Sequence, residues 1–178
     1  MMTTAKGVQF MSVIATAWFA IAAVAAAQES HARRAFEPFT AHWKGTFKVY
    51  SHEGRLLDQL EVEQRYWWQG NEQHATFVEK YRDGRVVRAE ARNYVQDGQL
   101  YCAVEKDNGE KSLHHGRWED GALFWYRKTE DGAITECFKE RVMVGTGGRE
   151  YHIDGFGLYG AGKEASGLLF EGRYYEMK

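Results

Sequence analysis

An arginine and a tyrosine near the end of the chain have the types and spacing of a binding site. Arg173 and Tyr175 lie two positions apart in an aromatic-rich stretch that is typical of a β-strand. Alternate residues of a strand share one face, so the guanidinium and the phenol can together hold one anionic head group. The other face of this strand is apolar, and the sequence leaves open which face points inward. That competing face consists of Leu168, Phe170 and Tyr174.

Motifs for catalysis and metal binding are absent or weak. The Gly-x-Ser-x-Gly elbow and the His-Glu-x-x-His zinc pattern do not occur. His114 and His115 are adjacent on a predicted strand, so they point to opposite faces and cannot chelate one metal together. A single axial histidine to haem stays open beside the commoner solvated or core histidine. His152 and Asp154 share a strand face as a base–orienter pair would, but such neighbours are usually exposed polar residues. We predict no catalytic residue, no metal and no cofactor.

Glycine-centred polar turns divide the chain into strands. From Gly54 to Gly145 they recur at intervals of 11 to 16 residues, and the stretches between them are rich in Val, Phe, Tyr, Trp and Thr. This spacing is typical of an antiparallel up-and-down meander, which at about ten strands closes into a barrel. The predicted fold class is therefore all-β. The strands are expected near 43–51, 56–69, 73–82, 85–96, 99–106, 112–118, 122–128, 133–144, 149–159 and 168–176.

Alternation along the strands indicates which side chains line the barrel. In the first two strands the apolar face opposes a charged face. We therefore expect four aromatic residues of these strands to contact a ligand: Trp43, Phe47, Tyr66 and Trp68.

Polar residues also fall on inward faces. Gln64 and Asn93 are either cavity polar groups or ordinary hydrogen-bonded interior residues. Glu136 and Glu140 share a face with Phe138, as carboxylates of a barrel mouth or lumen would.

The first 27 residues have the pattern of a secretory signal peptide. Lys6 is followed by the apolar residues 13–27, and three alanines precede Gln28. Fifteen apolar residues rise about 22 Å as a helix, short of a hydrocarbon core of about 30 Å. The alternative is an uncleaved membrane anchor. We predict cleavage, a run-in segment at 28–41, a barrel domain at 42–178, a periplasmic or secreted location and no membrane insertion after cleavage.

The amino-acid composition limits the classes of partner that the protein can bind. The chain of 178 residues has a formal net charge of −2 and no basic block, which argues against nucleic acid or an anionic membrane as partner. Its 10 Tyr, 10 Phe and 6 Trp suit a pocket for an apolar ligand. Cys102 and Cys137 would meet an oxidising compartment after export. Their predicted faces differ, which argues against a disulfide, but a bulge could reverse one face, so whether they pair stays open.

The C-terminal stretch from Phe170 to Tyr175 resembles the end of the intracellular fatty-acid-binding proteins, and Trp43-Lys44 is similar to the start of their barrel. The resemblance implies that Arg173 and Tyr175 hold a ligand carboxylate, with Arg141 in place of a second arginine. The lid of that family is replaced here by a bare turn. The chain also looks like the wider calycin group, including lipocalins, and like secreted bacterial barrels. A lipocalin-like arrangement implies that Arg173 packs over Trp43 to close the barrel floor.

The sequence as a whole predicts a secreted or periplasmic barrel that binds a small lipophilic molecule, with an acidic head group as one option. An enzyme of isomerase or hydratase type, acting on a lipophile at the barrel mouth, is one alternative. An envelope interaction module with a filled barrel is another.

Overall fold

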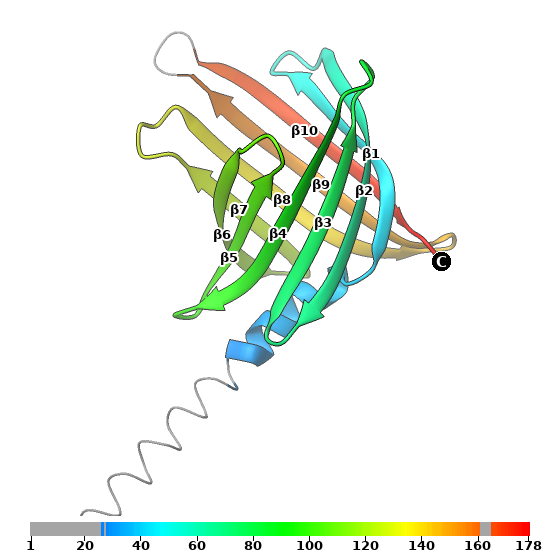
Figure 1. The fold of residues 1–178 in the computed structure, drawn as a ribbon, viewed down its shortest axis with the longest axis vertical. Helices are drawn as coiled ribbons and strands as arrows, with labels where there is room; N and C mark the ends of the chain where they lie inside the picture. The colour runs from blue at the N-terminus through cyan, green and yellow to red at the C-terminus, as the bar shows by residue number, and fades with distance from the viewer. Residues whose placement is uncertain (1–25, 27, 161–164) are drawn as a thin grey trace, which may run out of the picture.

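Ten antiparallel strands close into one barrel in the computed structural model, which describes residues 26, 28–160 and 165–178. Each strand pairs with the next one along the chain, as Figure 1 shows. This confirms the predicted all-β, up-and-down architecture. The strands are β1 (His42–Ser51), β2 (Leu56–Gln69), β3 (Glu72–Lys80), β4 (Val86–Gln96), β5 (Gln99–Lys106), β6 (Lys111–Glu119), β7 (Ala122–Lys128), β8 (Ile134–Gly145), β9 (Gly148–Tyr159) and β10 (Ser166–Glu176).

The barrel is closed by pairing between the first strand and the last. β1 and β10 run antiparallel from the pair Trp43–Glu176 to the pair Ser51–Leu168. Gly45 sits opposite Tyr174, and a Cβ atom at Gly45 would lie 1.9 Å from the Arg173 carbonyl oxygen. The closing seam therefore requires a glycine.

Two hairpins show why the turn residues divide the chain where they do. The loops after β4 and β6 consist of Asp97-Gly98 and Asp120-Gly121, and all four residues have positive φ. Two consecutive residues in this conformation match the right-handed twist of the flanking strands. Aspartate tolerates it and glycine adopts it freely, so the strands reverse at these positions.

The alternation predicted from the sequence is present in the strands. On β4, Val87, Ala89, Ala91 and Asn93 are buried, whereas the residues between them are exposed. The buried set faces the interior, so β4 contributes small side chains to the middle of the lumen.

Residues 28–39 form a plug at one end of the barrel. Residues 28–36 are helical and continue into the 3₁₀ turn η1 (Glu37–Phe39), and Figure 1 shows this segment at the foot of the barrel. Phe36 stacks on Trp125 with ring centroids 6.2 Å apart, and Phe39 meets the edge of Tyr151 at 5.1 Å. Both phenylalanines are buried.

Trp43 fastens the plug to the wall. Its indole N–H donates to the Phe39 carbonyl oxygen at 2.8 Å. The Arg149 guanidinium lies 5.1 Å from the centre of the Trp43 ring, pairs with Glu176 and donates to the Pro38 carbonyl oxygen. The cation over Trp43 therefore comes from Arg149 on β9, which corrects the alternative that placed Arg173 there.

The signal peptide predicted over 1–27 lies outside the described residues except at residue 26. Among the residues that the structure describes, no helix has the length and apolar character needed to cross a membrane. Cys102 and Cys137 are both free thiols. Cys102 lines the lumen, whereas Cys137 follows the inward-facing Glu136 on β8, so the two cysteines lie on opposite faces of the wall.

Candidate ligand-binding lumen

A cavity of about 210 Å³ lies inside the barrel above the plug. Its lining is mainly apolar and aromatic, with a small set of polar groups, which is the composition typical of small-molecule sites. The interior is therefore not solid. The apolar lining is Phe47, Val62, Phe77, Ala89, Ala91, Cys102, Val104, Trp125, Phe138 and Ile153, and the polar lining is Gln64, Tyr66, Glu79, Asn93, Lys106, His114, Glu140, Tyr151 and Tyr174.

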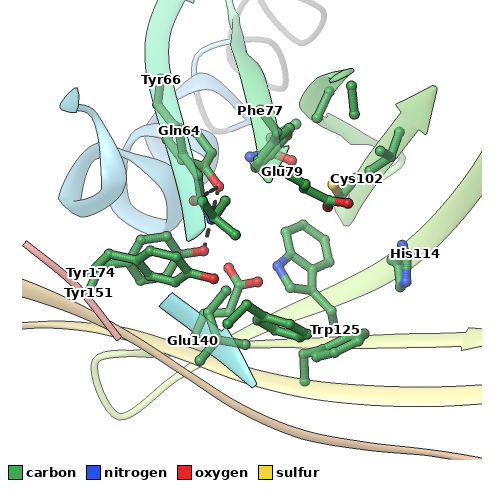
Figure 2. A pocket seen from close by; sticks show the side chains of 18 of the residues that line it. Gln64, Tyr66, Phe77, Glu79, Cys102, His114, Trp125, Glu140, Tyr151 and Tyr174 are labelled. Carbon is green, nitrogen blue, oxygen red and sulfur yellow. Dashed lines mark hydrogen bonds between the residues drawn. The ribbon is translucent and has the colours of Figure 1, made fainter. Parts of the chain in front are cut away.

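Three tyrosines and a glutamate form a polar cluster, here called the floor cluster: Tyr66, Tyr151, Tyr174 and Glu140. Figure 2 shows the Glu140 carboxyl group pointing into the cavity between the Tyr151–Tyr174 pair and Trp125. The Tyr66 hydroxyl donates to Gln64 at 3.2 Å and lies 3.5 Å from the Tyr151 hydroxyl. Strands β2, β8, β9 and β10 thus bring several donors to one end of an apolar cavity.

Glu140 has an unusual protonation state. Burial raises the pKa of its carboxyl group from 4.5 to about 7, and the nearby Tyr151 hydroxyl and Trp125 indole only partly oppose this rise. Burial, reinforced by the negative potential of Glu140, also raises the pKa of the Tyr151 and Tyr174 phenols. At neutral pH the tyrosines are therefore uncharged, and the Glu140 carboxyl group titrates near neutrality, so it can donate or accept a proton.

Asn93 presents an unsatisfied acceptor. Gln73, fully buried, donates through its amide nitrogen to the Phe36 carbonyl oxygen at 2.7 Å and to the Thr40 hydroxyl at 2.9 Å. Its carbonyl oxygen must then accept, and the Asn93 amide nitrogen donates to it at 3.0 Å. This network fixes the orientation of the Asn93 amide. The Asn93 Oδ1 atom is buried and has no hydrogen-bond partner among the described residues.

A second polar network lies farther from the plug. Glu136 accepts from His114 at 3.2 Å, from Arg127 at 3.3 Å and from the Tyr159 hydroxyl. Burial would raise the pKa of the Glu136 carboxyl group, but hydrogen bonds from His114 and Tyr159 and the charges of His114 and Arg127 outweigh it and lower the pKa to about 2. Two glutamates of one strand face thus have opposite protonation behaviour, because one has charged partners and the other does not.

The four aromatic residues predicted to contact a ligand have two different positions. Phe47 and Tyr66 line the cavity. Trp43 holds the plug, as described above, and Trp68 does so too, because its indole N–H donates to Glu37 at 2.8 Å and its ring stacks beneath Arg33 at 3.8 Å. The aromatic pattern could not separate these two positions, since both are on inward faces.

Arg173, Tyr175 and Arg141 do not line the cavity. Arg173 donates to the Ile153 carbonyl oxygen at 3.0 Å and to the Asp154 carboxylate at 2.6 Å, and Tyr175 is 59% exposed. The buried residues at this end of β10 are Phe170, Gly172 and Tyr174, so the competing apolar face points inward. A carboxylate-binding role for the three residues stays a prediction, and none of the three contacts the lumen.

His152 and Asp154, which the sequence places on one strand face, each pair with a different residue. His152 pairs with Glu150 at 3.0 Å, and Asp154 pairs with Arg173, so the two do not form a base–orienter pair. Within the described residues no group of three or more His, Cys, Asp or Glu side chains is placed to hold a metal ion.

Comparisons with known proteins place the chain in no family. No protein-family model and no curated protein sequence matches the chain. Among solved structures, the chain is similar to a de novo designed fluorescence-activating β-barrel, with 11% identity and a TM-score of 0.40. The match covers 79% of this chain and 95% of the designed one.

Proposed function

We propose that the protein is an exported, calycin-like barrel that binds a small lipophilic molecule in its lumen. The observation that carries this proposal is the apolar, aromatic cavity of about 210 Å³ inside the barrel, with a few polar groups at one end. An engineered apolar cavity of about 150 Å³ is known to admit benzene. The volume here therefore suits a compact ligand, such as one substituted ring, better than an extended fatty acid.

Ethylbenzene is a direct probe of this site, because it is compact, uncharged and free of polar groups. Calorimetric titration should show one molecule bound per chain. Ala91 is buried on the cavity wall, so Ala91→Leu adds three carbon atoms to the lumen and should abolish binding. Glu90→Gln, on the exposed face of the same strand, is the matched control and should bind like the parent. Equal binding by Ala91→Leu and the parent would show that ethylbenzene does not bind in the lumen.

Export is part of this proposal and rests on the residue pattern of 1–27. Expression of the full chain in a bacterial host should yield a mature N-terminus near Gln28 in the periplasmic fraction, as measured by intact mass. Soluble cytoplasmic protein that retains Met1 would contradict it.

A second candidate function, proton transfer to a bound lipophile as in an isomerase, is supported by Glu140. A carboxyl group with a pKa of about 7 beside tyrosine donors is suited to general acid–base catalysis at neutral pH. Deuterium incorporation from D₂O at the α-carbon of 4-ethylacetophenone tests it. Glu140→Gln should abolish protein-dependent exchange while ethylbenzene still binds. Equal exchange by parent and variant would leave binding as the function.

A further inference from the structure

The polar groups of the lumen define the head group that it accepts. The basic side chains lining the cavity, among the residues that the structure describes, are Lys106 and His114. Lys106 pairs with Glu110 at 3.0 Å and His114 with Glu136 at 3.2 Å, so both already have a carboxylate partner. Glu79 and Glu140 line the same cavity. Among the described lining residues both basic side chains are therefore already paired, and a ligand carboxylate would lie near Glu79, which opposes its binding.

Asn93 adds a specific requirement. Its amide nitrogen is committed to Gln73, whose own orientation is fixed by two acceptors of the plug. The acceptor Oδ1 is left without a partner on a side chain that is 6% exposed and lines the cavity. A buried acceptor without a donor is costly, so a ligand that supplies a donor gains affinity there. An ether or a hydrocarbon supplies none.

The floor cluster supplies the complementary donors. Tyr66, Tyr151 and Tyr174 are buried with their rings in the cavity wall. Tyr66 already donates its proton to Gln64, which leaves the Tyr151 and Tyr174 hydroxyls to donate to a neutral oxygen of a ligand. A head group that both donates and accepts, as a hydroxyl does, therefore satisfies the two kinds of polar group that the lumen offers.

We propose that the lumen selects a compact lipophile with an uncharged hydroxyl head group, a phenol or an alcohol, through the Asn93 carbonyl oxygen and the tyrosine hydroxyls. This rests on the proposed binding function and specifies its ligand class.

Three para-substituted ethylbenzenes that differ in their head group test the selection on the unmodified chain: 4-ethylphenol, 4-ethylanisole and 4-ethylbenzoate, titrated by calorimetry at pH 6. The phenol should bind at least about tenfold more tightly than the anisole or the benzoate, the scale of one hydrogen bond to a buried group. Anisole binding equal to phenol binding would overturn the requirement for a donor. Tightest binding by the benzoate would overturn the exclusion of carboxylates.

Substitution of Asn93 assigns the effect to its carbonyl oxygen. Asn93→Leu should lower the affinity for 4-ethylphenol about tenfold and leave that for ethylbenzene within twofold, while Glu90→Gln changes neither. An equal loss for both ligands would show that Asn93 acts only on the shape of the lumen and would refute the proposal. The ethylbenzene titration separates failure of the head-group inference from failure of the proposed binding function. Ethylbenzene binding without a preference for the phenol refutes this inference alone, whereas no binding of any of the four compounds refutes the proposed function as well.

Discussion

The two inward-facing glutamates of β8 should give the free energy of unfolding a maximum near pH 4.5. The carboxyl group of Glu140 has a pKa of about 7 in the folded chain, against 4.5 when it is solvated. Between these values the unfolded chain has lost the proton and the folded chain retains it, so stability falls as the pH rises from 4.5 to 7. A pKa difference of about 2.5 corresponds to about 3 kcal/mol.

Glu136 acts in the opposite direction. Its pKa is about 2 in the folded chain against 4.5 in water, so its stabilising contribution is present above pH 4.5 and is lost as the pH falls toward 2. The contribution at stake is again about 3 kcal/mol. The residue is buried with its His114 and Arg127 partners, so solvent screens this effect little.

Urea unfolding followed by tryptophan emission at pH 3, 4.5, 6 and 8 measures both contributions. Glu140→Gln carries no titrating group, so it should be more stable than the parent at pH 8 by up to about 3 kcal/mol, or about 6 to 12 °C in Tm. The difference between the two should vanish below pH 4.5. Glu136→Gln should lose the decline on the acid side and be less stable than the parent above pH 4.5. A Glu140→Gln variant that is no more stable than the parent at pH 8 would refute the buried, protonated state of Glu140.

Three further predictions concern residues of the barrel strands and their loops. Arg173→Met should leave the affinities for ethylbenzene and 4-ethylbenzoate within twofold of the parent and should cost less than about 1 kcal/mol in urea unfolding, because its ion pair is partly exposed and lies outside the lumen. A tenfold loss of affinity for 4-ethylbenzoate alone would restore a carboxylate-binding role. Gly45→Val should destabilise the barrel by more than about 2 kcal/mol, whereas Gly147→Ala, with open space around its Cβ position, should be neutral, and equal melting temperatures would contradict the close approach at the seam. Under non-reducing conditions, the intact mass of the protein should show no disulfide. Iodoacetamide should modify Cys137 well before Cys102, because burial in the lumen raises the pKa of the Cys102 thiol. Equal modification rates would show that the lumen does not shield Cys102.

The strands could be predicted from the sequence because their limits are local. Turn residues such as Asp97-Gly98 fix where a strand reverses, and alternation fixes which of its residues share a face. The orientation of β10 is different, because both of its faces carry large side chains, Arg173 with Tyr175 on one and Tyr174 on the other. Pairing with β9 and β1 decides the orientation, and those contacts are distant in the chain.

The floor cluster was missed for the same reason. Glu140 was identified as a candidate lumen carboxylate, but its environment depends on tyrosines from β2, β9 and β10. Tyr66 and Tyr151 are 85 positions apart in the chain, and only closure of the barrel brings their hydroxyl groups together. Alternation in the ninth predicted strand could have placed Tyr151 on an inward face, but no local pattern indicates which residues share its end of the lumen.

Closure by β1 and β10 also governs the order of folding. Hairpins between neighbouring strands form from local contacts, whereas the pair Trp43–Glu176 joins opposite ends of the barrel sequence and carries a large loop-closure entropy. Until Ser166–Glu176 is in place, β1 and β9 are two open sheet edges, each able to add a strand from another chain. Pairing of the final 11-residue strand thus decides whether the preceding nine strands form a closed barrel or begin to aggregate.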